Sequence, residues 1–206
     1  MLTALQKRQQ QQYKRFEAWA RDESTEERPV QLSTYMEPTQ QVRIQWLSDN
    51  CLGTTVEVGC SWGYVLAKCG GQCGIDINPR LVELATTLNR DARFLAGDAR
   101  DVPLTDQSFD TVLLTEILEH VPLEDVPKVL TEATRIARQR VLITIPMGDH
   151  DTKEAICFKH RWLCDSGTLN DIIQQNLGEY RVELFYDGTF YYLKVCQNTE
   201  QARQQQ

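Results

Sequence analysis

Two carboxylates and an imidazole stand within five residues in the segment EILEH, residues 116–120. If this segment is helical, spacings of three and four residues place Glu116, Glu119 and His120 on one face. Such a group fits three descriptions: solvated residues of a surface helix, an acid–base cluster, or ligands of a metal ion. The residue types leave all three open, so the elements that position the segment must decide between them.

Length and composition restrict the classes of protein to which the chain can belong. Its 206 residues are enough for one domain with a full core and a short extension. The formal net charge of −7 argues against a general affinity for nucleic acid or anionic membranes. No apolar run approaches the roughly 20 residues that span a bilayer, and the N-terminus has no apolar signal core, so we expect a cytoplasmic protein. Seven cysteines at irregular spacings indicate reduced thiols rather than a disulfide framework.

Strand-like and helical patterns alternate from Thr54 onward. The apolar runs that predict strands are residues 54–58, 72–76, 92–97, 109–114 and 140–146. The patterns that predict helices are residues 78–89, 124–137 and 165–178. The first of these helices has Asn78 at its N-cap and Pro79 at its first position. Residues 180–197 are predicted to form two strands around the turn YDGT.

Alternation of strands and helices indicates a parallel sheet with helices on both faces. We therefore predict an α/β fold whose Rossmann-like, doubly wound sheet has seven strands and is mostly parallel, with a C-terminal antiparallel hairpin and additional N-terminal helices. The first 50 residues are polar and glutamine-rich, and we expect them to form a helical extension or lid. Within it, residues 37–50 predict a helix with Val42, Trp46 and Leu47 on its apolar side. The main domain is expected at residues 51–197 and a polar tail at residues 198–206.

A glycine-containing loop, VEVGCSWGY at residues 56–64, lies where the first predicted strand gives way to a helix. Gly59 and Gly63 allow the backbone to turn sharply and approach a ligand, in front of the free N–H groups of the helix. The dinucleotide fingerprint G-x-G-x-x-G fails here, because Ser61 and Tyr64 stand where its second and third glycines belong. A phosphate loop also fails, since no Gly-Lys-Ser/Thr follows.

Acidic residues stand at three successive strand ends, Glu57, Asp76 and Asp98. Asp76, in GIDINP, can accept two hydrogen bonds from a ribose diol, and Asp98, in GDARDVPL, follows the next strand. Three carboxylates would repel a pyrophosphate, whereas they suit a nucleoside that carries a positive amino group. Taken singly, a strand-terminal aspartate also serves as a helix cap or a turn residue.

The segments VEVGCSWGY, GIDINP, GDARDVPL and FDTVLLTEILEHV together resemble the class I S-adenosylmethionine-dependent methyltransferases, of the type 11 or 12 kind, over roughly residues 40–196. The resemblance implies S-adenosylmethionine as the cofactor and methyl transfer as the activity. The cofactor-binding residues that it implies are Glu57, Gly59, Cys60, Gly63, Asp76, Ile77, Asp98, Ala99 and Thr115. Glu57, Gly59, Gly63 and Thr115 would lie near the methionine part, Asp76 at the ribose hydroxyls, and Asp98 and Ala99 at the adenine edge. The middle glycine of the family loop is Ser61 in this chain.

The EILEH segment is similar to the E-x-x-E-H metal motif of two groups of methyltransferases, the small-RNA 3′-terminal 2′-O-methyltransferases and the ubiquinone-pathway O-methyltransferases. In the RNA group a further histidine follows the fifth strand and precedes a basic and an aromatic residue. His160, Arg161 and Trp162 in KHRWLCDSGTL match that local pattern, whereas the sequence around Cys164 departs from it. His150 in MGDHD is a competing candidate.

The resemblance implies a divalent metal held by Glu116, Glu119, His120 and His160. Two carboxylates and two imidazoles suit Mn²⁺, Co²⁺, Fe²⁺ or Zn²⁺ better than Mg²⁺. A bound ion would activate and position an acceptor hydroxyl. Without one, His120 or His160 would act as the base, so the same four residues are the catalytic candidates.

The leading functional hypothesis is O-methylation of a small hydroxylated metabolite or sugar, with S-adenosylmethionine and a divalent metal as cofactors. A second hypothesis is 2′-O-methylation of an RNA 3′ end, against which the negative charge and the lack of an RNA-binding module count. A third is methylation of nitrogen or carbon without a metal. The last is a non-catalytic subunit that binds the cofactor and a partner protein, supported by the glutamine-rich N-terminus alone.

Overall fold

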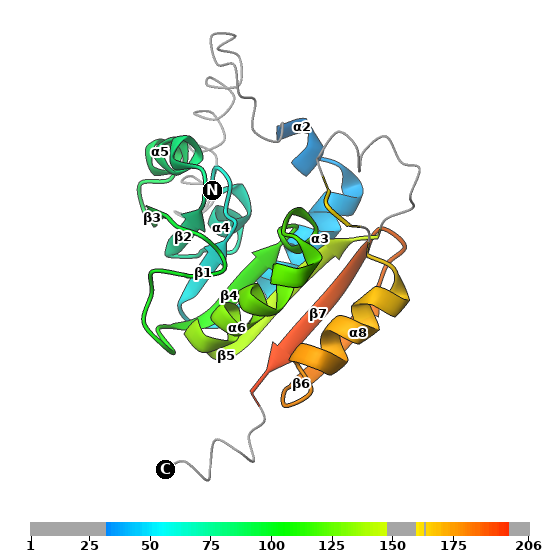
Figure 1. The fold of residues 1–206 in the computed structure, drawn as a ribbon. Helices are drawn as coiled ribbons and strands as arrows, with labels where there is room; N and C mark the ends of the chain where they lie inside the picture. Colours follow the sequence, from blue (N-terminus) through cyan, green and yellow to red (C-terminus); the bar gives the residue numbers. More distant parts are fainter. Residues whose placement is uncertain (1–31, 148–159, 163, 198–206) are drawn as a thin grey trace.

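The computed structural model describes residues 32–147, 160–162 and 164–197. Seven strands form one sheet in the order β3-β2-β1-β4-β5-β7-β6 (Figure 1). The strands are β1 Thr55–Val58, β2 Cys73–Asp76, β3 Arg93–Ala96, β4 Phe109–Thr115, β5 Ala137–Pro146, β6 Arg181–Tyr186 and β7 Phe190–Cys196. Strands β1 to β5 pair in parallel, and β7 runs antiparallel between β5 and β6. The predicted seven-stranded, mostly parallel sheet with a C-terminal hairpin is thereby confirmed.

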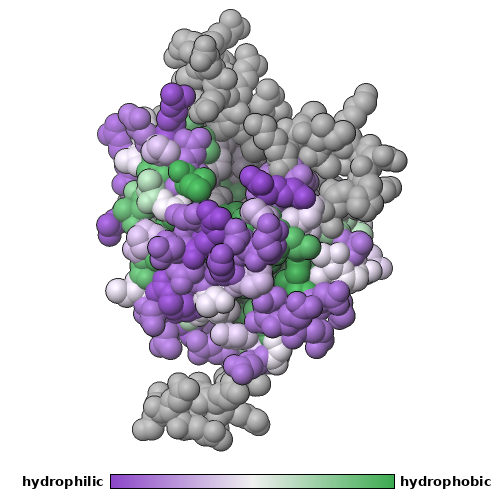
Figure 2. All heavy atoms as spheres, viewed as in Figure 1, coloured by the Kyte–Doolittle hydropathy of each residue, from purple (hydrophilic) through white to green (hydrophobic). Residues whose placement is uncertain are grey.

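Helices cover both faces of the sheet. They are α2 Leu32–Tyr35, α3 Pro38–Asn50, α4 Tyr64–Lys68, α5 Pro79–Leu88, α6 Val126–Ile136 and α8 Ser166–Asn176, with short 3₁₀ turns η1 Leu118–His120 and η2 Leu123–Asp125. Helices α6 and α8 pack on one face, together with Val112 and Leu114 of β4. Helices α3 and α4 pack on the other face, against Leu113. Consecutive residues of β4 therefore serve the two layers alternately, as the period of a strand requires. Outward-facing side chains on the α6 side are mostly hydrophilic (Figure 2).

Local sequence signals explain where the helices begin. Helix α5 begins at Pro79, and the Asn78 side chain accepts a hydrogen bond from the backbone N–H of Arg80, as predicted. Helix α8 begins after Asp165, whose Oδ1 atom accepts the Thr168 N–H at 2.7 Å. Both caps satisfy N–H groups that the first turn of a helix leaves without internal partners.

The buried face of α3 differs from the predicted one. Val42 is 58% exposed, so it does not belong to the packed side of the helix. The residues that face the protein interior are Gln40, Arg43, Ile44 and Leu47, which share helical spacing. Leu47 is buried as predicted. The apolar pattern missed Gln40 and Arg43 because they are polar, and both line the cavity described below.

Some expectations fall on residues outside the described parts of the chain. These are the first N-terminal helix, the polar tail at residues 198–206, and the competing candidate His150. Among the described helices, none is long and apolar enough to cross a membrane.

Candidate functional site

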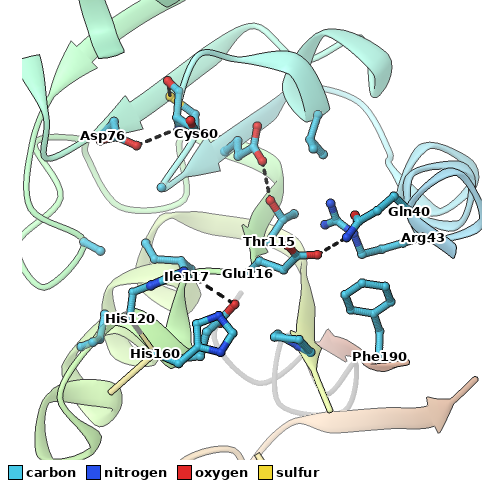
Figure 3. Close-up of a pocket in the computed structure, with 18 of the residues that line it drawn as sticks. Gln40, Arg43, Cys60, Asp76, Thr115, Glu116, Ile117, His120, His160 and Phe190 are labelled. Carbon is cyan, nitrogen blue, oxygen red and sulfur yellow. Dashed lines mark hydrogen bonds and ion pairs between the residues drawn. The ribbon is translucent and has the colours of Figure 1, made fainter. Parts of the chain in front are cut away.

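A cavity of about 770 Å³ opens between the ends of the strands and the α2–α3 segment. Figure 3 shows Asp76 and Cys60 on one side of it, His120 and His160 on another, and Arg43 with Phe190 on a third. The cavity lies at the carboxyl edge of the parallel strands, where open α/β sheets bind ligands. The predicted site residues that line it are Glu57, Gly59, Cys60, Asp76, Ile77, Asp98, Ala99, Thr115, Glu116, Glu119, His120 and His160.

The loop after β1 is shaped by three residues with left-handed backbone conformations. Gly59 and Gly63 have φ of 80°, and Ser61 has φ of 49°. Ser61 therefore adopts the conformation that the family glycine would adopt at lower cost. At Gly59 a side chain would also collide with Ile117, since an added Cβ atom would stand 2.4 Å from its Cδ1 atom. The loop thus passes close to the EILEH segment without an intervening side chain.

Asp76 holds this loop and still faces the cavity. Its Oδ2 atom accepts the Ser61 N–H at 2.7 Å, and its Oδ1 atom accepts the Asn78 N–H at 2.9 Å. Partial burial raises the pKa of the Asp76 carboxyl, and the two backbone N–H groups oppose that rise. Each oxygen accepts one backbone hydrogen bond and retains a lone pair, so the carboxylate fits the two hydroxyls of a ribose.

Glu57 links the elements that form the floor of the site through buried hydrogen bonds. It is buried, its Oε2 atom accepts the Leu66 N–H at 2.8 Å, and its Oε1 atom accepts the Thr115 hydroxyl at 2.5 Å. Burial raises the pKa of Glu57 to about 7, against the lowering effect of these hydrogen bonds. Glu57 therefore joins β1 to α4 and to the end of β4, and both of its oxygens already have donors.

Two further residues that were predicted to bind the cofactor, Asp98 and Gly63, differ in whether they line the cavity. Asp98 lines the cavity, but its carboxylate is paired with the Arg100 guanidinium, 2.6 Å from Nη2, which lowers the pKa of Asp98. Arg100 also lines the cavity and pairs with Asp125 at 2.8 Å. Gly63 does not line the cavity, because the ring of Phe94 occupies the space beside its Cα atom. Packing against Phe94, rather than contact with a ligand, explains why residue 63 is a glycine.

The EILEH segment is not an α-helix, and the expectation of one helical face is wrong. Glu116 continues the sheet, since its N–H donates to the Thr144 carbonyl at 3.0 Å, and it then turns the chain with φ of 51°. Only residues 118–120 are helical, in the single 3₁₀ turn η1. The Glu116 side chain consequently points toward Arg43, away from His120 and His160 (Figure 3).

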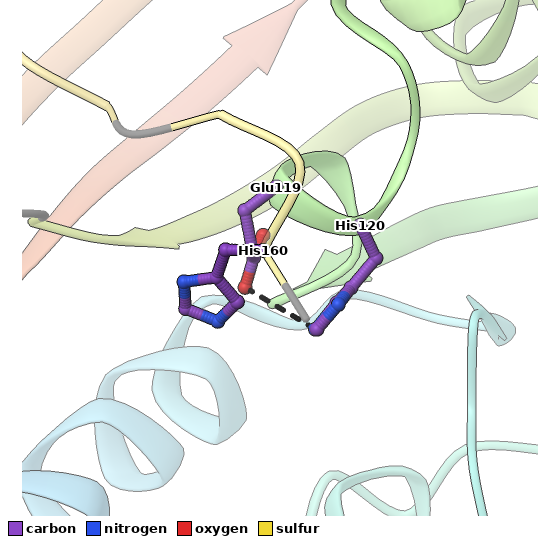
Figure 4. Close-up of side chains that lie close together, drawn as sticks. All are labelled: Glu119, His120 and His160. Carbon is purple, nitrogen blue, oxygen red and sulfur yellow. Dashed lines mark ion pairs between the residues drawn. The ribbon is translucent and has the colours of Figure 1, made fainter. Parts of the chain in front are cut away.

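Glu119, His120 and His160 come together (Figure 4). One potential ligand atom from each lies within 4.8 Å of the others, and the two imidazole rings are 5.0 Å apart. His160 reaches the group because the Arg161 N–H donates to the Glu119 carbonyl at 2.7 Å. Trp162 secures the same segment, since its Nε1–H lies within 3.0 Å of two backbone carbonyls of the turn.

The Glu119 carboxylate is the most unusual group of the cluster. Its residue is 1% exposed, and neither oxygen has a hydrogen-bond partner among the described residues. Burial, with the nearby negative charge of Glu116, raises the pKa of Glu119 well above its usual range. A buried carboxylate without donors is unfavourable unless a positive charge compensates it. One carboxylate and two imidazoles are a donor set that a divalent transition metal accepts.

Arg43 is a site residue that the sequence analysis did not find. It is 1% exposed, lines the cavity, and lies 2.8 Å from Glu116 Oε1 through its Nε atom. The Nε–H itself points to Gln40 Oε1 at 2.9 Å, so the contact with Glu116 is an ion pair without a directed hydrogen bond. Nη1 donates to Thr144 Oγ1 at 3.2 Å, and the guanidinium lies 5.4 Å from the Phe190 ring. The helical spacing of Arg43 from Gln40 and Leu47 is the sequence feature that could have indicated its position on the inner face of α3.

Comparisons with known proteins agree with this architecture. Residues 56–145 match the family model described as a methyltransferase domain. Ajmaline N-methyltransferase of Rauvolfia serpentina is 36% identical over an alignment of 101 residues, which covers 44% of this chain and 34% of that protein. The chain thus spans about a third of the length of the curated relatives it matches first.

Two solved structures share the fold. One, from Thermotoga maritima, is described as a possible histamine N-methyltransferase; its TM-score is 0.63 at 18% identity, covering 75% of this chain and 87% of that one. The other is magnesium protoporphyrin IX methyltransferase of Synechocystis PCC 6803 with bound S-adenosylhomocysteine; its TM-score is 0.59 at 16% identity, covering 91% and 93%. The family match identifies residues 56–145 as a methyltransferase domain, and the fold of the chain is the one found in these methyltransferases of known structure.

Proposed function

We propose that the chain transfers the methyl group of S-adenosylmethionine to a hydroxyl group of a small hydroxylated metabolite or sugar, assisted by a divalent ion at Glu119, His120 and His160. The observation that carries the proposal is the Glu119 carboxylate, which is buried beside two imidazoles and has no hydrogen-bond donor within the described part of the chain. The same cavity contains Asp76, which is suited to a ribose diol. One cavity therefore offers positions for a nucleoside and for an ion.

The cofactor would occupy the side of the cavity formed by the ends of β1, β2 and β3. Asp76 would accept the ribose hydroxyls, and the backbone at Gly59 would approach the cofactor closely because no side chain intervenes. Ala99 and the Arg100-paired Asp98 would border the adenine. Bound S-adenosylmethionine supplies a methyl group on a sulfonium, which is electrophilic without further activation by the protein.

The acceptor hydroxyl needs help, because a neutral hydroxyl is a weak nucleophile. Glu119, His120 and His160 would hold a divalent ion, which would supply Lewis-acid activation of the acceptor hydroxyl. Glu119 would contribute the negative charge that holds the ion, and its burial keeps that charge from water. The His120 side chain is 40% exposed, with Nε2 4.0 Å from Glu119 Oε1, so it borders both the cluster and solvent. The proton released by the acceptor hydroxyl would leave to solvent at this exposed edge of the cluster.

The test is transfer of labelled methyl from S-adenosylmethionine to a panel of catechols and sugar diols, with Mn²⁺ or with EDTA. We expect product only with the ion, and none from Glu119→Ala or His160→Ala. Arg138→Ala is the matched control, because Arg138 pairs with Asp110 away from the residues that line the cavity. Transfer to a diol at equal rates with Mn²⁺ and with EDTA would contradict the role of the ion.

A nitrogen acceptor is the second candidate, favoured by the match to ajmaline N-methyltransferase. Under this alternative the Glu119 carboxylate, with its raised pKa, would itself take the proton released by an amine. The same assay with cyclic amines separates the two candidates. Methylation of an amine in EDTA, without any diol methylation, would establish the nitrogen acceptor.

A further inference from the structure

The Arg43–Glu116 ion pair separates one predicted ion ligand from the other three. Glu119, His120 and His160 form a close group, whereas Glu116 lies outside it and contacts Arg43 at 2.8 Å. Glu116 is nevertheless near enough for its charge to influence both Glu119 and His160. Glu116 therefore lies outside the cluster because its side chain is oriented toward Arg43, and not because it is far from the cluster.

Both partners of the ion pair are anchored. Arg43 reaches Thr144 of β5 and Phe190 of β7 as well as Glu116, so α3, β5 and β7 all hold the guanidinium. The Glu116 backbone is bonded to the Thr144 carbonyl and has a left-handed φ, which is costly for a residue with a side chain. Arg43 is buried and Glu116 is half-buried, so removing the glutamate would leave a buried positive charge uncompensated. The ion pair with Arg43 and the backbone hydrogen bond to Thr144 thus stabilise the orientation of the Glu116 side chain.

The number of protein ligands decides what an ion can do. Structural sites are closed by four protein ligands, whereas catalytic sites keep positions open for water or substrate. An octahedral ion with three protein ligands would keep three open positions. A fourth ligand, the Glu116 carboxylate, would reduce them to two and add a negative charge that disfavours an anionic diol or catechol. We propose that Arg43 is a positioning residue that holds Glu116 out of the ligand set, so that the ion keeps open positions for a chelating vicinal diol or catechol. This inference rests on the proposed function.

The first experiment is a calorimetric titration of Mn²⁺ into the metal-stripped full chain saturated with S-adenosylhomocysteine. Glu116→Gln should bind Mn²⁺ within about threefold of wild type, whereas Glu119→Gln should lose about a hundredfold, as expected for a direct ligand. Arg43→Met should bind Mn²⁺ about tenfold more tightly, because it removes a positive charge and frees Glu116 to coordinate. Arg138→Met is the control for loss of an ion-paired arginine elsewhere.

The second experiment measures the open positions with 4-nitrocatechol, whose absorbance changes when both oxygens bind a metal ion. Wild type and Glu116→Gln, loaded with Mn²⁺, should bind the probe equally. Arg43→Met should bind it about tenfold more weakly, although it binds the ion more tightly. Opposite changes in the two affinities are not expected from a residue that only supports the fold.

Three outcomes would overturn the inference. One is a loss of Mn²⁺ affinity in Glu116→Gln as severe as that in Glu119→Gln, which would make Glu116 a ligand. Another is an Arg43→Met variant in which neither affinity changes, or both change in the same direction. Failure of the wild type to bind Mn²⁺ would remove the proposed ion and this inference together. If Arg43→Met does not fold, Glu116→Gln decides alone, because it leaves the arginine in place.

Discussion

Replacing Glu119 by methionine should stabilise the metal-free protein while abolishing its response to a divalent ion. Glu119 is 1% exposed, and its oxygens lack hydrogen-bond partners among the described residues. A buried polar group in that condition costs about 1–3 kcal/mol. Methionine has a similar volume and no polar oxygen, so Glu119→Met should raise the free energy of unfolding by that amount. For a chain of this size, each kcal/mol corresponds to roughly 2–4 °C in Tm.

A bound ion should offset the difference in the free energy of unfolding between wild type and Glu119→Met. A ligand that binds only the folded state at about 100 times its Kd adds about 2.7 kcal/mol of stability. Wild type should gain that amount with Mn²⁺, which offsets its deficit, whereas Glu119→Met should gain nothing. The assay is urea unfolding of both proteins at pH 7.5, once with EDTA and once with Mn²⁺.

The advantage of Glu119→Met should also depend on pH. Folding raises the pKa of Glu119, so the folded protein retains the proton over a range in which the unfolded chain has lost it. The stability of the wild type therefore falls as pH rises above the ordinary carboxyl range, until the folded pKa is reached. The difference between variant and wild type should be smaller at pH 5 than at pH 7.5. A variant that is less stable than wild type in EDTA, or that gains equally from Mn²⁺, would refute the reasoning.

Three further predictions concern the cofactor, the loop and the histidine segment. Asp76→Asn should lower the affinity for S-adenosylhomocysteine about tenfold or more, since charged hydrogen bonds contribute about 1.5–3 kcal/mol; an affinity equal to that of the surface control Asp106→Asn would contradict this. Gly59→Ala should lower the free energy of unfolding by at least about 1 kcal/mol, because φ is 80° and the new methyl group would meet a carbon atom at 2.4 Å; unchanged urea unfolding would count against it. Trp162→Phe removes the indole N–H that binds two backbone carbonyls, and calorimetry should show about tenfold weaker Mn²⁺ binding with unaltered S-adenosylhomocysteine binding; loss of both affinities would indicate general unfolding.

The strands and helices followed from local patterns because their causes are local. Helix α5 was placed by its Asn78 cap and by Pro79, and both act as expected. Strand β5 begins at Ala137, three residues before the predicted start. Its early part contains polar residues that disguise the strand, although Ala137 pairs with Phe109 of β4. Pairing with a distant strand is information that a local pattern lacks.

The conformation of the EILEH segment could not be predicted from its local sequence. Its spacing is compatible with a helix, but the Glu116 N–H remains bonded to Thr144 in the sheet, and this tertiary bond outweighs the local pattern. The orientation of Glu116 then depends on Arg43, which is far away in the sequence. A charged residue within a helical pattern is normally assigned to the solvent side, so the charge of Arg43 hides the helical spacing that it shares with Gln40 and Leu47. His160, by contrast, was marked by the KHRW resemblance and lies beside Glu119 and His120.

The central claim is that one cavity holds both the methyl donor and a divalent ion. The most direct measurement is calorimetric titration of Mn²⁺ into metal-stripped wild type saturated with S-adenosylhomocysteine, alongside Glu119→Ala and His160→Ala. The account predicts one ion per chain for wild type, and loss of that binding in both variants while S-adenosylhomocysteine still binds. A wild type that binds S-adenosylhomocysteine but no ion would contradict the claim, and the search for the acceptor would then turn to nitrogen.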